Sequence, residues 1–149
     1  MAWNGRHFLS LADLSREDMI GLMHHASHFL DAGDRYEPSA PLAEKIVANL
    51  FLENSTRTRC SFTIATKRLG GDVVDLLGGT SSVSKGETIV DTAMNLEAMG
   101  VAAIVIRCTS DTGPWDVAEK VGVPVINAGS GTNSHPTQAL LDAITLTRY

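Results

Sequence analysis

The sequence predicts an α/β fold, an open doubly wound sheet of about four parallel strands with helices on both faces. Four short apolar segments recur along the chain, at residues 46–52, 73–77, 102–107 and 123–127. Their apolar character is nearly continuous rather than alternating, which is typical of strands that helices cover on both faces. Stretches with helical periodicity separate these segments, and this succession favours a parallel sheet. The length of 149 residues favours a single domain over residues 1–149.

The helices are predicted from apolar periodicity and capping residues. The first spans 14–30, where Ser15 and Asp18 can cap its start. Residues 31–41 mix Gly, Asp, Ser and Pro without periodicity, so they form a connection. The remaining helices are predicted at 58–69, 87–99, 114–121 and 136–148. In an open α/β sheet, ligands bind at the carboxyl ends of the strands, so functional residues are expected in the loops that follow the strands.

Charge and hydropathy exclude two classes of partner. The net charge is −5 and basic and acidic residues are interspersed, so no basic field attracts nucleic acid or an anionic membrane. No apolar run approaches the roughly 18 to 20 residues that span a bilayer. The N-terminus also lacks the pattern of a secretory signal peptide. We therefore expect a cytoplasmic protein without nucleic-acid or membrane partners, which captures any anion with local groups.

A candidate anion site follows the first strand, in the run Ser55-Thr-Arg-Thr-Arg. A strand that leads directly into a helix presents free backbone N–H groups and the positive end of the helix dipole at the sheet edge. Three hydroxyl groups and two guanidinium groups add donors that suit a phosphate. Arginines in a first helical turn oppose the dipole unless an anion compensates them. The alternative is that the hydroxyls only cap the helix and the arginines are solvated.

Two further loops bring polar residues to the same edge. Arg107 ends the third strand, and His135 and Gln138 follow the fourth in a Gly-rich turn. Pro136 suits the first position of the last helix. A helix N-terminus disfavours the imidazolium, so a neutral His135 could donate to a carbonyl oxygen. Alternatively, Gln138 reaches back to the backbone in a capping box. Because Arg57, Arg107 and His135 belong to three strand-end loops of one edge, we expect them to line one crevice.

A histidine cluster is a weaker candidate for a metal site. His24, His25 and His28 have spacings that place two imidazoles on one helical face, but no cysteine or carboxylate completes a tetrahedral set. A polar helix face is the favoured interpretation. We expect no metal at this position.

Three motifs resemble those of the aspartate carbamoyltransferase family, in the order found there. They are Ser55-Thr-Arg-Thr-Arg, Ser84-Lys-Gly-Glu-Thr and His135-Pro-Thr-Gln, and the similarity runs from about Leu9 to Tyr149. The resemblance implies the N-terminal, carbamoyl-phosphate-binding domain of a catalytic chain. Such an enzyme transfers the carbamoyl group of carbamoyl phosphate to L-aspartate, giving N-carbamoyl-L-aspartate and phosphate in de novo pyrimidine biosynthesis.

The resemblance also implies roles for the motif residues. The phosphate would be held by Ser55, Thr56, Arg57 and Thr58. Arg107 would bridge the phosphate and the carbonyl oxygen, His135 would polarise the carbonyl, and Gln138 would accept from the carbamoyl amide. The residues implied in catalysis are Arg57, Thr58, Lys85, Arg107 and His135. They would act by positioning the substrates and by electrostatic stabilisation, without a cofactor.

The middle motif indicates the acceptor and the assembly. Ser-Lys-Gly-Glu-Thr after a Ser-rich loop is similar to the aspartate enzymes, whereas ornithine enzymes usually carry a different sequence there. By the same resemblance, Lys85 with Ser82 or Ser81 reaches the site of a neighbouring subunit, which implies a homotrimer of catalytic chains. The sequence leaves open which of the two serines takes part, and whether regulatory or other pyrimidine-pathway chains bind.

The family pattern includes a second domain that binds aspartate, and this chain ends inside the helix that leads to it. We therefore expect the chain to bind carbamoyl phosphate and phosphate without turnover on its own. Two alternatives remain. One is half of an ornithine carbamoyltransferase, and the other is a non-catalytic module that binds a phosphoanion.

Overall fold

The computed structural model describes residues 5–32, 40–78 and 87–148. Its centre is a parallel sheet with the strand order β2-β1-β3-β4. The strands are β1 (Ile46–Phe51), β2 (Asp72–Leu77), β3 (Ala103–Cys108) and β4 (Val125–Ser130). The prediction of an α/β fold with a four-stranded parallel sheet is therefore confirmed.

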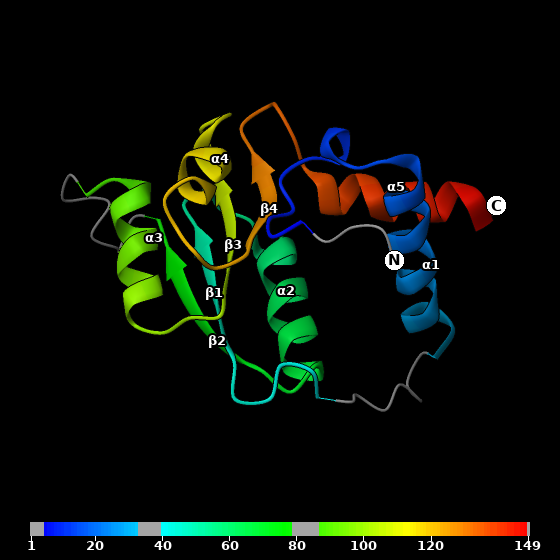
Figure 1. Ribbon diagram of the computed structural model, residues 1–149, viewed down its shortest axis with the longest axis horizontal. Coiled ribbons are helices and arrows are strands. Elements are labelled where there is room, and N and C mark those ends of the chain that lie inside the picture. Colours follow the sequence, from blue (N-terminus) through cyan, green and yellow to red (C-terminus); the bar gives the residue numbers. More distant parts are fainter. Residues whose placement is uncertain (1–4, 33–39, 79–86, 149) are drawn as a thin grey trace.

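Helices cover both faces of this sheet. They are α1 (Arg16–Ala32), α2 (Thr56–Arg68), α3 (Ile89–Ala98), α4 (Gly113–Ala118) and α5 (Pro136–Arg148), with a short 3-10 turn at Leu11–Asp13. Figure 1 shows α3 and α4 on one side of the sheet and α2 and α5 on the other, with α1 beside α5. Each predicted helix is present, although α4 is shorter than expected. Among the described residues, no helix has both the length and the apolar character needed to cross a bilayer.

The core is divided between the two faces because side chains alternate along each strand. Ala48 and Leu50 of β1 pack with the larger cluster, which includes Leu96 of α3 and Val117 of α4. The smaller cluster includes Val47, Phe51 and Val105, with Phe62 of α2 packed against it. The strands are thus anchored on both faces, which fixes the positions of the loops at their carboxyl ends.

The fourth strand differs from its prediction. Its apolar segment was expected to end at Asn127 and to lead into a Gly-rich turn, but β4 continues to Ser130. The fully buried Asn127 side chain donates from Nδ2 to Leu9 O at 3.0 Å and to Ser130 Oγ at 3.1 Å, and its Oδ1 accepts from Gly129 N at 2.9 Å. These bonds satisfy buried polar groups that would otherwise disfavour a strand here. The edge of β4 is bridged by Phe8, whose backbone bonds to Val125 and Asn127.

Candidate functional site

The start of α2 lies at the carboxyl end of β1 and lacks the side-chain capping found at the starts of α1 and α3. Ser55 is its N-cap residue, but its side chain makes no capping hydrogen bond, and the first turn contains no acidic residue. In contrast, α3 begins with a complete capping box between Thr88 and Asp91. Arg57 and Arg59 lie in the first turn of α2, where positive charge opposes the helix dipole. This end of α2 is therefore suited to an anion.

A cleft of about 560 Å³ lies between α2 and the start of α5. Its lining includes Arg57, Thr58 and Ser61 on one side and His135, Thr137 and Gln138 on the other. The structure thus brings together four of the predicted site residues, Arg57, Thr58, His135 and Gln138, from segments almost 80 residues apart in the chain. A cleft between two helix starts at the strand ends is the usual place for a ligand in such a fold.

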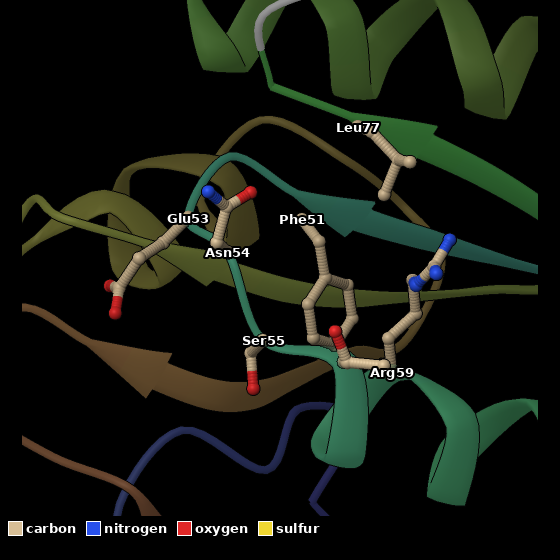
Figure 2. A pocket seen from close by; sticks show the side chains of 7 residues that line it. Phe51, Glu53, Asn54, Ser55, Arg59 and Leu77 are labelled. Carbon is tan, nitrogen blue, oxygen red and sulfur yellow. The ribbon is translucent and has the colours of Figure 1, made fainter.

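The side chains of the Ser55-Thr-Arg-Thr-Arg motif line two separate hollows. Ser55 and Thr56 line a second, smaller one of about 110 Å³, together with Glu53 and Arg59. Figure 2 shows Glu53 and Arg59 pointing to opposite sides of the segment that joins β1 to α2. Arg59 Nη1 lies 3.6 Å from Asp75 Oδ2 on β2. Consecutive residues of a helical turn point in directions about 100° apart, so Ser55 and Thr56 do not share the cleft with Arg57.

Arg107 is the penultimate residue of β3 and is held from both sides, by the segment after β1 and by β4. Its Nη2 donates to Glu53 Oε1 at 3.0 Å, and its Nη1 donates to Ala128 O at 3.2 Å. Its Nε is buried and has no hydrogen-bond partner within the part of the chain that the structure describes. Glu53 is a residue of the site for which the sequence predicted no role. The one signal for it was its position directly after a strand.

Gly129 allows Arg107 and His135 to lie close together. A Cβ atom at this position would be 2.9 Å from Arg107 Nη1 and 3.5 Å from His135 Cδ2. The φ angle of Gly129 is +123°, a conformation that residues with a side chain rarely adopt. Arg107 is therefore adjacent to the cleft that Arg57 and His135 line, on the His135 side.

His135 has an environment that favours the neutral imidazole. Burial lowers the pKa of His135, and the nearby Arg107 guanidinium lowers it further, while the Asp142 carboxylate partly opposes both. Thr137 Oγ1 lies 3.3 Å from His135 Nδ1. If Nδ1 accepts this bond, Nε2 carries the proton and can donate to a ligand. The sequence indicated a neutral His135 from the helix terminus, and the structure adds burial and Arg107 as causes.

Gln138 interacts along α5 rather than with the start of the helix. Its Nε2 donates to Asp142 Oδ1 at 2.9 Å. Among the described residues, its side chain makes no bond to the backbone at the N-terminus of α5, so it does not form the alternative capping box. Its position in the cleft with Arg57 leaves the amide available to a ligand.

The structure describes some of the remaining candidate residues but not others. Ser81, Ser82 and Lys85 lie outside the described residues. On α1, His25 and His28 contact the Phe29 ring edge-on, with ring centroids 5.2 and 6.3 Å apart. Within the described ranges, no three His, Cys, Asp or Glu side chains are grouped as metal ligands.

Family and sequence comparisons identify what this chain is similar to. Residues 6–148 match the family described as aspartate/ornithine carbamoyltransferase, carbamoyl-P binding domain. The chain is 49% identical over 146 residues to the aspartate carbamoyltransferase catalytic subunit of Streptomyces avermitilis, covering 96% of this chain and 45% of that protein. It is 48% identical over 141 residues to the catalytic subunit of Aliarcobacter butzleri, covering 95% of this chain and 46% of that protein. The chain thus spans less than half the length of these curated relatives.

Solved structures share the fold over almost the whole chain. The aspartate transcarbamoylase of Trypanosoma cruzi in complex with carbamoyl phosphate has a TM-score of 0.88 at 37% identity, covering 97% of this chain and 47% of that chain. The catalytic subunit of M. jannaschii aspartate transcarbamoylase has a TM-score of 0.87 at 37% identity, with the same coverage. Another structure of the Trypanosoma cruzi enzyme is a complex with carbamoyl phosphate and aspartate.

Proposed function

Because this chain belongs to the aspartate/ornithine carbamoyltransferase family, we propose that it is the carbamoyl-phosphate-binding half of an aspartate carbamoyltransferase. The complete enzyme transfers the carbamoyl group to the α-amino group of L-aspartate and releases phosphate. Relatives named for aspartate support this acceptor over ornithine. The proposal assigns aspartate recognition to the part of the relatives that this chain does not cover.

One observation carries the proposal, the meeting of Arg57 and Thr58 with His135 and Gln138 in a single cleft. The phosphate is assigned to the uncapped start of α2, where free N–H groups, the helix dipole and Arg57 all attract an anion. Ser55 and Thr56, whose side chains line the neighbouring hollow, take part through their backbone N–H groups at the same helix start. Because this segment contains no glycine, it differs from the glycine-rich loops that bind nucleotides, and a simple phosphate group suits it better.

The carbonyl end of the ligand is assigned to Arg107 and His135. A neutral imidazole donates to the carbonyl oxygen and stabilises the negative charge that develops there during transfer. Arg107 lies beside His135, and its buried Nε lacks a partner among the described residues. To reach the ligand, the Arg107 guanidinium must exchange its bond with Glu53 for bonds to the phosphate and the carbonyl oxygen. Gln138 accepts from the carbamoyl amide.

Further parts of the proposal rest on the resemblance alone. They include a homotrimer in which Lys85, with Ser82 or Ser81, completes the site of a neighbouring subunit. A role in pyrimidine biosynthesis and a cytoplasmic location belong to the same set. Binding of regulatory or pyrimidine-pathway chains belongs to this set as well. Substantial citrulline formation by the complete enzyme would refute the aspartate assignment.

Calorimetric titration of carbamoyl phosphate into the chain tests the binding proposal. Arg57→Ala should weaken binding by about 10- to 100-fold, because a charged hydrogen bond contributes about 1.5–3 kcal/mol. Arg68→Ala is the matched control, since Arg68 lies at the opposite end of α2. Circular dichroism should show that both variants keep the fold. Unchanged binding by Arg57→Ala would refute the assignment of the phosphate to α2.

A further inference from the structure

The Gln138 amide is held in one orientation by a carboxylate one helical turn away. Gln138 Nε2 donates to Asp142 Oδ1 at 2.9 Å. An ionised carboxylate only accepts hydrogen bonds, so the end of the amide that faces Asp142 must be the NH2 group. The carbonyl oxygen, Oε1, is therefore the end that remains for a ligand. In the described part of the chain, this oxygen has no hydrogen-bond partner.

Asp142 lies one helical turn beyond Gln138 and acts on a second residue of the site. Gln138 lines the cleft with Arg57 and His135. The pKa of His135, which burial and Arg107 lower, is partly raised again by the Asp142 carboxylate. Although the Gln138–Asp142 pair is exposed, the Asp142 charge therefore acts on two residues of the site.

We infer that Asp142 is a positioning residue, which presents Gln138 Oε1 to the cleft and makes the site select a carbamoyl group over an acyl group of the same shape. This inference rests on the proposed function. A carbamoyl NH2 group donates to Oε1, whereas the methyl group of an acetyl compound cannot. A reversed Gln138 would present its own NH2 to the ligand NH2, and two donors do not pair.

The expected loss of selectivity follows from the fraction of chains in which the Gln138 amide presents Oε1 to the cleft. An apparent dissociation constant is the intrinsic one divided by that fraction. An exposed Gln–Asp bond at this spacing contributes about 0.2–0.5 kcal/mol, so without the carboxylate the fraction falls to about a half. Selectivity for the carbamoyl group should therefore decrease about twofold, while affinity for the phosphate end is retained.

A pair of stable phosphonates isolates this effect. Phosphonoacetamide and phosphonoacetone carry the same phosphonate and carbonyl, and differ in an NH2 group against a methyl group. Their dissociation constants are measured by calorimetry for the wild-type chain and for Asp142→Asn. The ratio of the two constants is the readout, because loss of one negative charge near the cleft tightens both anions alike and cancels in the ratio.

Two further variants separate positioning from a structural role. Asp142→Glu keeps the acceptor and should restore most of the ratio. Asp116→Asn is the matched control, since it removes the same charge and an exposed bond of the same spacing, in which Thr112 Oγ1 donates to Asp116 Oδ2 at 2.9 Å. It should leave the ratio unchanged.

The outcomes distinguish the inference from the proposed function. A ratio that falls in Asp142→Asn, recovers in Asp142→Glu and stays constant in Asp116→Asn supports the inference. An unchanged ratio in Asp142→Asn, with normal wild-type binding, overturns the inference and leaves the proposed function standing. A wild-type chain that binds neither phosphonate, or that shows no preference for the amide, overturns the carbamoyl phosphate site itself and the inference with it.

Discussion

Arg107 and Glu53 form an ion pair across the carboxyl edge of the sheet, with Nη2 and Oε1 3.0 Å apart. The pair joins the end of β3 to the segment between β1 and α2. Both side chains are partly exposed, at 20% and 36%, so solvent screens the attraction and the pair adds little stability. Its main consequence concerns binding, because an anion that is to bind Arg107 must compete with the Glu53 carboxylate.

Glu53→Gln should therefore tighten the binding of phosphate. Glutamine keeps the size of the side chain but removes the competing charge, so an increase in affinity of about three- to tenfold is expected in low salt. Calorimetry with inorganic phosphate measures it. Glu119→Gln removes an equal charge at the end of α4 and should have no such effect. Weaker binding by Glu53→Gln would show instead that Glu53 holds Arg107 in its binding position.

Gly129→Ala should disturb the site and the fold together. The new Cβ would meet Arg107 Nη1 at 2.9 Å, at a φ of +123°. Backbone strain of this kind costs about 1–3 kcal/mol, and displacement of the guanidinium should weaken phosphate binding about tenfold or more. Gly100→Ala is the control, since its φ is +94° but nothing lies within 4 Å of its Cβ position. It should lose stability in denaturant titrations without a loss of binding. Equal binding by both variants would contradict the prediction.

Asn127→Ala should be among the more destabilising single changes. Removal of this buried side chain leaves the Leu9 carbonyl and the Gly129 N–H without these bonds, whereas the Ser130 hydroxyl keeps its bond to Ser134 O. Buried polar groups left unpaired cost about 1–3 kcal/mol each, so a loss of at least 2–3 kcal/mol, roughly, is expected in urea unfolding. Asn95→Ala removes an exposed bond to Glu87 and should change stability by less than about 0.5 kcal/mol. Similar losses of stability for both variants would indicate that the end of β4 keeps its structure without the Asn127 side chain.

The strands and helices could be predicted because their signals are local. The four apolar segments lie within a few residues of the observed strands, and Pro136 marks the start of α5. The extension of β4 could not be predicted, because Asn127 and Gly129 are poor strand residues and become suitable only through a bond to Leu9, which lies 118 residues away in the chain. Tertiary contacts decided the structure at this point.

The meeting of Arg57, Thr58, His135 and Gln138 at one edge of the sheet could be predicted, but the pairings of the side chains could not. The topology of the sheet indicated that Arg57, Arg107 and His135 would meet at one edge. The bond between Arg107 and Glu53 joins residues 54 positions apart, and no local pattern predicts which carboxylate faces a given arginine. The division of Ser55 and Thr56 from Arg57 depends on the direction of each side chain around the first turn of α2.

His135 should titrate at a lower pH than an ordinary histidine. Burial, and then Arg107, lower the pKa of His135 below its usual 6.5, so its NMR titration midpoint should lie below that value. Arg107→Gln should move the midpoint upward, whereas Arg68→Gln at the far end of α2 should not. The unfolded imidazole binds its proton at a higher pH than the folded one, so this group destabilises the fold as the pH falls below 6.5 and has no such effect above it. A midpoint at or above 6.5, or one insensitive to Arg107→Gln, would contradict the neutral His135 on which carbonyl polarisation depends.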